Sequence, residues 1–372
     1  MECDRNIGDY PGLKKNEVEL LKELSEAFGV AGFEGEALEI IKRNVEPFAD
    51  KIERDKLGSL LFSIKGETET PQVLVVGHAD EIGFIVNALD KGFVKFIPVG
   101  GWDQQVLQSQ RVVINTKKGK IKGVISSKPP HLKDTEERKK LVEIRDMYID
   151  VGATSEEELK RLGVRIGDPI IPDARFERSA FADKVIGKAF DDRIGVYIAI
   201  DTLRRIKSQG IIHSNTVIGA ATVQEEVGLR GARTVPNIAE PDAAIIVDVD
   251  IAGDVPGIKE YEAPIKLGKG PAIVAYDASM IANNNFKELA IEVAEKNKIP
   301  YQLSVLARGG TDAGQIHLHK AGCPSLVIGL PTRHIHSFTS ILSLDDVERT
   351  IQLIIELIKI LDEVQVASLT RG

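Results

Sequence analysis

The segment TVIGAATVQEEVGLRG (216–231) is the starting point for interpreting the chain. Residues 216–223 are almost continuously apolar, as is typical of a strand that is covered on both faces of a sheet. The run ends at Glu225 and Glu226, two adjacent carboxylates that repel each other. Because successive residues in an extended chain point in opposite directions, we expect the two carboxylates to have different roles.

The apolar run belongs to a repeated pattern that predicts the fold class. Short apolar runs recur at 72–77, 243–249 and 324–330. Segments with apolar residues at helical spacing accompany these runs, and they comprise 16–28, 34–48, 192–209, 284–298 and 343–364. Buried strands that alternate with amphipathic helices predict an α/β protein, organised as a three-layer α/β/α sandwich of the kind found in zinc peptidases.

The segment 83–182 has a different pattern. Its apolar stretches are short and alternating, and Gly and Pro interrupt them, which is typical of a small antiparallel β domain with hairpin turns. We therefore predict a discontinuous α/β domain, formed by 1–82 and 183–372, with a β-barrel-like domain inserted at 83–182.

Composition narrows the possible partners and location. A net charge of −8 without an evident basic face argues against nucleic acid, and no apolar run is long enough to span a membrane. Cys3 and Cys323 are the only cysteines, and no signal-peptide pattern opens the sequence. The expectation is a cytoplasmic protein without disulfide bonds.

Ionisable residues follow each of the apolar runs. In an open α/β sheet, ligands bind beyond the carboxyl ends of the strands, so these residues are expected to share one edge. An Asp pair also stands where the helix over 192–209 should begin. The residues concerned are His78, Asp80, Asp191, Asp192, Glu225, Glu226, Asp248, Asp250, His334 and His336.

Taken singly, each of these residues has an ordinary structural interpretation. His78 could be a hydrogen-bonded loop residue, and the Asp191–Asp192 pair could cap a helix. Glu225 and Glu226 could lie at the surface. These interpretations are weak together, because all of the residues would then have to gather at one edge by chance.

The chemistry of this set points to metal ions. Imidazoles and carboxylates without a thiolate suit Zn, Co or Mn. Two histidines with at least three carboxylates exceed the needs of a single ion with an open position, and they match a two-metal site that activates a water molecule. A carboxylate that does not bind metal is then needed to accept and return the proton of that water. One member of the Glu225–Glu226 pair can bind metal while the other faces the water.

Six motifs, in this order and spacing, resemble the M42 family of dinuclear metalloaminopeptidases, which includes the TET aminopeptidases and glutamyl-aminopeptidase-like enzymes. They are GHADEIGF (77–84), KAFDDRIG (188–195), VQEEVGLRGA (223–232), VDVDIAGDVPG (247–257), GGTDAG (309–314) and RHIHS (333–337). The resemblance covers nearly the whole chain, including the inserted β domain.

The resemblance implies two divalent ions, Zn or Co, in each subunit. One ion would be bound by His78, Asp191 and Asp248, and the other by Asp191, Glu226 and His336. It also implies a cis peptide bond after the bridging Asp191, with Asp192 as the second choice for the bridge.

Further residue roles follow from the same resemblance. Glu225 would be the general base, and Asp80 would orient the ring of His78. Arg308, Gly310 and Thr311 would lie near the substrate, in a loop that also contains Gly309 and Asp312. Asp250 would bind substrate too, and we hypothesise that its charge favours a basic side chain. His334 would line the pocket or have no role.

The expected activity is removal of N-terminal residues from short peptides by a water molecule that two metal ions activate. The family further implies a homo-oligomer, a tetrahedral dodecamer built from dimers, with the inserted β domain making the dimer contacts. The alternatives are a related metal hydrolase (a carboxypeptidase or deacylase), an endoglucanase, and a non-enzymatic shell protein with a vestigial site.

Overall fold

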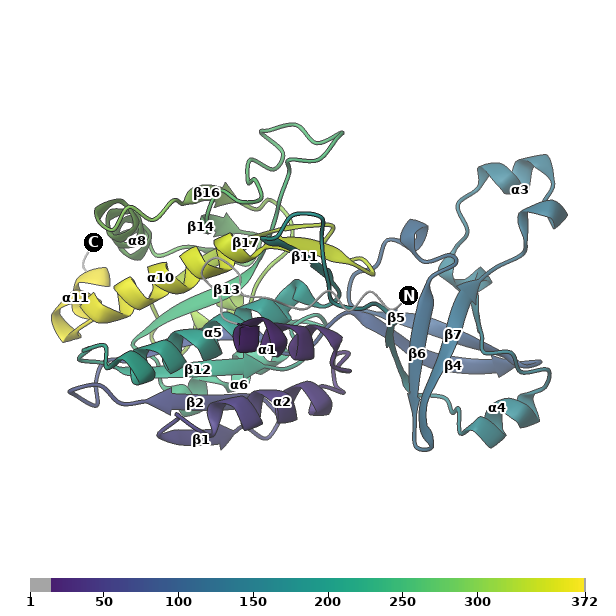
Figure 1. Ribbon diagram of the computed structural model, residues 1–372, viewed down its shortest axis with the longest axis horizontal. Helices are drawn as coiled ribbons and strands as arrows, with labels where there is room; N and C mark the ends of the chain where they lie inside the picture. Colours follow the sequence, from purple (N-terminus) through teal and green to yellow (C-terminus); the bar gives the residue numbers. More distant parts are fainter. Residues whose placement is uncertain (1–14, 371–372) are drawn as a thin grey trace.

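The computed structural model describes residues 15–370, which form a large sheet covered by helices and a smaller barrel beside it (Figure 1). Cys3 lies outside the described residues, whereas Cys323 is buried with a free thiol. Within residues 15–370, no helix combines the length and the hydropathy that crossing a bilayer would require. The α/β class and the separate small antiparallel barrel expected from the sequence are both confirmed.

Four parallel strands form the centre of the large sheet, in the order β12 (Thr216–Thr222), β3 (Gln72–His78), β13 (Ala243–Ile251) and β17 (Ser325–Arg333). Their side chains are buried on both faces, which is why they read as continuous apolar runs. The structure confirms all four predicted strands with small differences in their ends. Because they are parallel, their carboxyl ends meet at one edge.

The sheet has twelve strands in total, and the outer ones were not predicted from the sequence. They are mostly short and partly exposed, so their apolar pattern is weak. These strands are β1 (Lys51–Arg54), β2 (Leu60–Ile64), β10 (Glu177–Arg178), β11 (Lys184–Gly187), β14 (Ala272–Asp277), β15 (Met280–Ile281), β16 (Gln302–Val305) and β18 (Ser340–Ser343).

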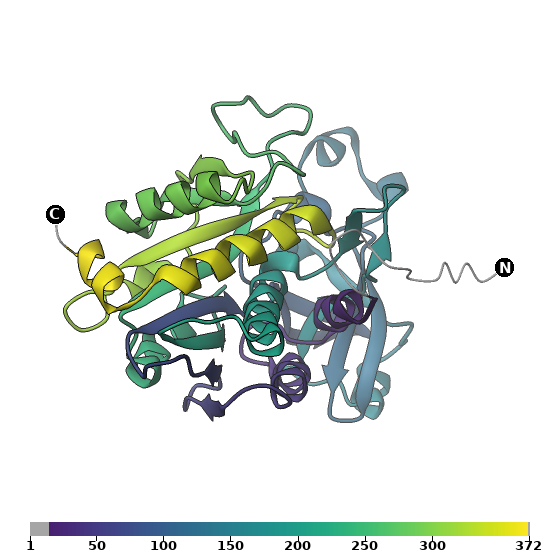
Figure 2. The same ribbon diagram turned by 60° about the vertical axis from the view of Figure 1, so that its left-hand side comes forward.

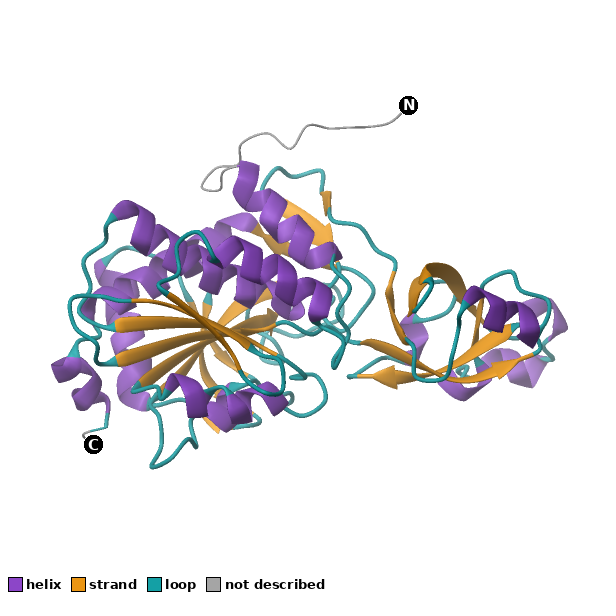
Figure 3. Ribbon diagram, turned by 90° about the horizontal axis from the view of Figure 1, so that it is seen from below, coloured by secondary structure: helices purple, strands orange, loops and turns teal. Residues whose placement is uncertain are grey.

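Helices cover both faces of the sheet, which is seen between them in Figure 3. One face carries α5 (Phe190–Gln209), packed against β3 and β13, with α8 (Asn284–Lys296) and α10 (Leu344–Ile360) side by side next to it (Figure 2). The remaining helices of this region are α1 (Lys15–Glu26), α2 (Gly35–Val45), α6 (Arg230–Thr234), α7 (Pro236–Ala239), α9 (Ala313–Ile316) and α11 (Glu363–Leu369). The predicted helical segments are confirmed, and the last of them divides into α10 and α11.

The barrel is closed by six antiparallel strands with their own apolar core. Phe84 and Trp102 stack in this core, with ring centroids 4.8 Å apart. Its strands are β4 (Gly83–Asp90), β5 (Phe93–Val99), β6 (Arg111–Thr116), β7 (Gly119–Ser126), β8 (Tyr148–Asp150) and β9 (Pro169–Pro172). The barrel also carries the short helices α3 (Thr135–Lys139) and α4 (Glu156–Leu162). Strand β10 already belongs to the large sheet, so the expected division at residue 182 falls after the chain has left the barrel.

Candidate metal centre and active site

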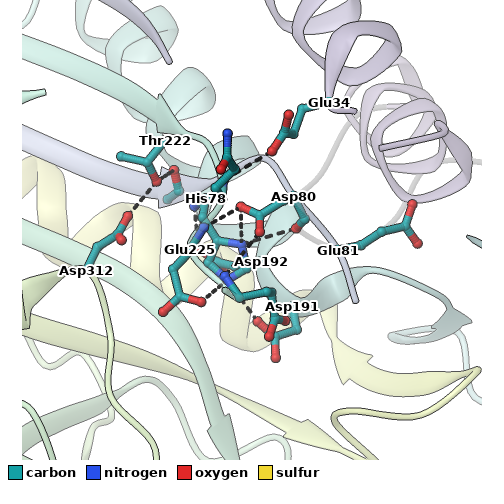
Figure 4. A network of polar contacts seen from close by, with 12 residues as sticks. Glu34, His78, Asp80, Glu81, Asp191, Asp192, Thr222, Glu225 and Asp312 are labelled. Carbon is teal, nitrogen blue, oxygen red and sulfur yellow. Dashed lines mark hydrogen bonds and ion pairs between the residues drawn. The ribbon is translucent and has the colours of Figure 1, made fainter. Parts of the chain in front are cut away.

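The ionisable residues lie together at the carboxyl edge of the parallel strands (Figure 4). His78 is the last residue of β3, and Asp248 lies within β13. Glu225 follows the end of β12, and His336 follows β17. Asp191 begins α5, whose regular helical dihedral angles start only after Asp192. Four strands and one helix thus deliver charged side chains to one place, as the order of the apolar runs predicts.

Asp191 lies between two imidazoles. Its Oδ1 is 3.1 Å from His78 Nε2, and its Oδ2 is 3.3 Å from His336 Nε2. Each oxygen of the Asp191 carboxylate therefore faces a different ring. The peptide bond between Asp191 and Asp192 is cis, as expected from the resemblance.

Asp192 is turned away from this arrangement. Its Oδ2 accepts a hydrogen bond from the backbone N–H of His78 (3.0 Å), and its Oδ1 accepts one from the backbone N–H of Gly195 (3.0 Å). The side chain is fully buried. It therefore joins the end of β3 to the first turn of α5, in the manner of a helix cap.

Asp80 fixes the turn that carries the two glutamates. Its Oδ1 and Oδ2 accept hydrogen bonds from the backbone N–H groups of Glu225 (2.9 Å) and Glu226 (3.1 Å). His78 Nδ1 lies 3.1 Å from the carbonyl oxygen of Asp80 and 3.5 Å from its Oδ1. Asp80 thus orients the histidine largely through its backbone, while its carboxylate holds the turn after β12.

Glu225 and Glu226 point at different rings. Glu225 Oε2 is 3.8 Å from His78 Nε2, whereas Glu226 Oε2 is 3.8 Å from His336 Nε2. Both side chains are largely buried, with 9% and 5% of their surface exposed. The two adjacent carboxylates therefore occupy separate halves of the site.

Imidazoles are the ion-pair partners of the carboxylates in this site. Within residues 15–370, every ion pair that involves Asp191, Glu225 or Glu226 is made with an imidazole. Burial, together with the charge of Asp191, raises the pKa of Glu226 to about 8. Burial also raises the pKa values of Asp192, Glu225 and Asp248 well above their ordinary range. Without a cation, this set would hold protons at neutral pH.

The pKa values of the two histidines are raised as well, which favours the charged form of each imidazole. The contact with Asp191 raises the pKa of His336 to about 10. Burial alone would raise the pKa of Asp191, but its contacts with His336 and His78 hold it well below the ordinary range. The site therefore contains an excess of carboxylates, and bound metal ions would compensate their negative charge.

Two groups of ligand atoms have the spacing of a metal site. His78, Asp191 and Glu226 form one group, and His78, Asp192 and Asp248 form the other, with the atoms of each group within 4.8 Å of one another. The buried Oε1 of Glu226 has no hydrogen-bond partner among the described residues. These groups differ from the expected ligand sets in two ways: Asp248 is grouped with Asp192 and not with Asp191, and Glu226 is grouped with His78 and not with His336.

A cavity opens onto these residues, and Arg308, Gly310 and Thr311 line it as expected. Asp250 is absent from its walls: the side chain is 1% exposed and packs against Gly329. The ring of His334 also lies outside the cavity, and its carbonyl oxygen accepts hydrogen bonds from the hydroxyls of the loop that follows it. The remaining lining residues are His78, Asp191, Glu225, Glu226, Asp248, Val249, Ile251, Leu306, Gly309, Ile335 and His336.

One contributor to the site, Gly101, was not found from the sequence, and a second, Asp312, was expected only as part of the loop near the substrate. Gly101, at the end of a barrel strand, places its carbonyl oxygen 2.8 Å from His336 Nδ1. Asp312 is buried, accepts a hydrogen bond from the hydroxyl of Thr222, and has a pKa that burial raises to about 6. In the sequence, these two residues belong to the pair GG (100–101) and the motif GGTDAG. Neither pattern indicates where the residues lie relative to the site.

Comparisons with known proteins agree with this geometry. The family model described as M42 glutamyl aminopeptidase matches residues 58–353. A TET aminopeptidase from a marine sediment archaeon of the Thaumarchaeota is 54% identical; the match covers 95% of this chain and 99% of that one, with a TM-score of 0.94. The TET1 peptidase of Pyrococcus horikoshii, which can assemble into a tetrahedron or a large octahedral shell, is 34% identical over 93% of this chain and 100% of that one (TM-score 0.81). The lysyl aminopeptidase of Pyrococcus furiosus is 34% identical, with 90% of this chain and 94% of that protein covered.

Proposed function

The chain belongs to the M42 glutamyl aminopeptidase family and is a metal-dependent aminopeptidase, and from that premise we propose that it removes N-terminal residues from short peptides with Glu225 as the general base. The observation that carries the proposal is the position of Asp191. Its two oxygens lie 3.1 and 3.3 Å from the Nε2 atoms of His78 and His336. A carboxylate held between two imidazoles suits a bridge between two metal ions.

We assign His78, Asp191 and Asp248 to one ion, and Asp191, Glu226 and His336 to the other. The nitrogen and oxygen donors, the absence of a thiolate and the unpartnered buried oxygen of Glu226 fit Zn²⁺ or Co²⁺. When bound, such ions polarise a carbonyl group and lower the pKa of water. Asp192 is the weaker choice for the bridge, because backbone N–H groups already occupy both of its oxygens.

Glu225 is the acid–base group in this assignment. It belongs to neither group of closely spaced ligand atoms, yet it lines the cavity and lies 3.8 Å from His78 Nε2. Its carboxylate accepts the proton of the attacking water and then donates it to the leaving amine. Asp80 keeps it in place through the backbone N–H of Glu225.

The acidic residues that line the cavity are the proposed metal ligands Asp191, Glu226 and Asp248, together with Glu225. Bound metal ions would offset the charge of these ligands, so Glu225 is the acid left to attract a free α-amino group. Arg308, Gly310 and Thr311 also line the cavity, and we place the substrate against them. The apolar part of the lining, which consists of Val249, Ile251, Leu306 and Ile335, is suited to an aliphatic side chain.

We further propose a homo-oligomer, with the tetrahedral dodecamer as its form and the barrel as its dimer contact. The support is the likeness to the TET1 peptidase of Pyrococcus horikoshii, which can assemble into a tetrahedron or a large octahedral shell. Light scattering of the purified protein tests the mass. A barrel deletion that still gave dimers would contradict the assigned contact.

The other hydrolases considered from the sequence have less support. An endoglucanase needs two facing carboxyl groups and has no use for the two histidines. A carboxypeptidase or deacylase would use the same metals with a different substrate polarity. Assays with an aminoacyl anilide, an N-blocked peptide and cellulose, each with and without chelator, separate these activities.

The variant Glu225→Gln tests the central assignment. We expect kcat to fall at least 10²-fold, because the proton acceptor is lost. Metal content and assembly should stay at the level of the unmodified protein, because Gln keeps the size of the side chain. The exposed Glu240→Gln is the matched control, with full activity expected. Retained turnover in Glu225→Gln would refute the role of Glu225, and full activity after chelation would refute the metal site.

A further inference from the structure

The cavity wall formed by residues 308–311 contains three exposed residues, Arg308, Gly309 and Gly310. This loop joins β16 to α9, and two of its residues are glycines, which add no side chains to hold it. A loop of this kind is mobile unless other groups fix it. Residues outside the cavity must therefore hold this wall in position.

We propose that Asp277 is the positioning residue of this wall, an inference that rests on the proposed function. Asp277 is 1% exposed, and it is the last residue of β14. Its Oδ2 accepts a hydrogen bond from the hydroxyl of Thr311 (2.8 Å), across 34 positions of sequence. Thr311 lines the cavity, whereas Asp277 does not, so Asp277 acts on the substrate only through Thr311.

The other oxygen of Asp277 makes the anchor rigid. Its Oδ1 accepts hydrogen bonds from the backbone N–H and the hydroxyl of Ser279 (both 2.6 Å) and from the backbone N–H of Met280 (2.8 Å). The carboxylate thus closes the turn between β14 and β15 and holds the loop at the same time. Hydrogen bonds to an ionised carboxylate are about twice as strong as those between neutral groups.

A second row of contacts joins the turn to the loop. Ser279 Oγ accepts a hydrogen bond from the backbone N–H of Thr311 (3.3 Å), and the backbone N–H of Ala278 donates to the carbonyl oxygen of Gly309 (3.0 Å). A Cβ on Gly310 would lie 2.8 Å from Ser279 Cβ, so only glycine permits this approach. The turn and the wall are packed together as one unit, with Asp277 at its centre.

The chain offers a matched control in Asp346. This buried carboxylate also accepts hydrogen bonds from two backbone N–H groups, those of Gly268 (2.6 Å) and Gly270 (2.7 Å), and thereby fixes a glycine-containing loop. It contributes nothing to the walls of the cavity. A purely structural role for such an anchor predicts the same behaviour from Asp277→Asn and Asp346→Asn.

The experiment compares Asp277→Asn, Ser279→Ala and Asp346→Asn in the metal-loaded enzyme. For Asp277→Asn we expect KM to rise about tenfold, the equivalent of about 1.4 kcal/mol, while kcat falls less than threefold and metal affinity is unchanged. Ser279→Ala should raise KM by a smaller factor. Amides of 306–312 should exchange hydrogen faster in both variants, and Asp346→Asn should change only thermal stability.

The outcomes separate this inference from the proposed function. Unchanged KM in both Asp277→Asn and Ser279→Ala, with stability lowered as in Asp346→Asn, would overturn the positioning role. A parallel loss of metal affinity would overturn it too, because Asp277 would then act through the metal site. Should Asp277→Asn fail to fold, Ser279→Ala with its exchange measurement decides alone. Failure of the proposed function itself would be seen in Glu225→Gln, independently of these variants.

Discussion

The two ends of helix α5 carry charged clusters that differ in their counter-ions. At its first turn, Asp191 faces two imidazoles and has no Lys or Arg partner among the described residues. Three turns later, Asp201 is buried more deeply, with 1% of its side chain exposed against 14% for Asp191, but Arg205 Nε lies 2.8 Å from its Oδ2. Arg205 in turn pairs with both oxygens of Glu348 on α10 at 2.7 Å.

This comparison separates structural charge from functional charge. The cluster around Asp201 contains its own Arg counter-ions and fixes α5 to α10, so folding alone supplies its positive charge. Burial raises the pKa of Asp201 as well as those of Asp192, Glu226 and Asp248, so the counter-ions distinguish the two clusters: around Asp191 the described residues supply imidazoles only. Carboxylates that the chain itself leaves without cations indicate that the cations come from outside.

The largest expected effect is at the unbalanced end. Asp191→Asn should lower kcat/KM more than 10³-fold, because an amide could not supply the negative charge of the proposed bridge between two ions. Metal content, measured by atomic emission, should fall together with activity. Arg205→Met, at the balanced end, should retain metal and most of its kcat. Full metal content in Asp191→Asn would contradict the comparison, and it would mean that another residue forms the proposed bridge.

The second effect is on stability, and here the large loss is expected at the balanced end, in the cluster around Asp201. Arg205→Met should lower the free energy of unfolding by about 3 kcal/mol, since Glu348 loses its bidentate partner and Asp201 is left with Arg204 alone. Glu240→Gln, which removes one half of an exposed ion pair, should cost less than about 1 kcal/mol. Denaturant unfolding measures both. A loss at Arg205→Met as small as that of the control would mean that the cluster around Asp201 contributes little to stability.

The fold was predictable from the sequence where burial is complete. Strands β3, β12, β13 and β17 are covered on both faces, so their apolar runs are continuous and their order determines the shared edge. The outer strands were missed because a short, half-exposed strand such as β1 leaves little pattern. The site was predictable for the same reason, since its residues follow the buried strands directly.

The sequence could not indicate in which direction each side chain points or which distant segments meet. Asp248 and Asp250 are two positions apart on one strand, and they were expected to bind metal and substrate respectively, yet only Asp248 lines the cavity. The role of Asp277 was equally hidden, because its partner Thr311 is distant in sequence. Contacts between segments far apart in the chain depend on how loops fold back, and periodicity carries no information about that.

A third effect is a pH dependence found only at the unbalanced end. In the metal-free protein, Glu226 titrates at about 8 and His336 at about 10, both higher than in the unfolded chain. Between about pH 5 and pH 9 the folded state therefore binds more protons than the unfolded state, so stability falls as the pH rises. The metal-loaded protein should lack this slope, because metal displaces the protons. Thermal unfolding of both forms at pH 5.5, 7 and 8.5 tests it, and parallel curves would contradict the charge imbalance.

The smallest effect concerns Asp250, which belongs to neither kind of cluster. Its carboxylate is buried without a normal hydrogen bond, and burial raises its pKa to about 6, an effect that the nearby Ser304 hydroxyl only partly opposes. Asp250→Asn should therefore raise the melting temperature by about 2 °C, because an unpaired charge is removed. Its ratio of kcat/KM for lysyl and leucyl anilides should change less than twofold, because Asp250 does not line the cavity. A selective loss of the lysyl substrate would instead show that the charge of Asp250 reaches the site through Asp248, and that an unbalanced carboxylate can serve specificity without touching substrate.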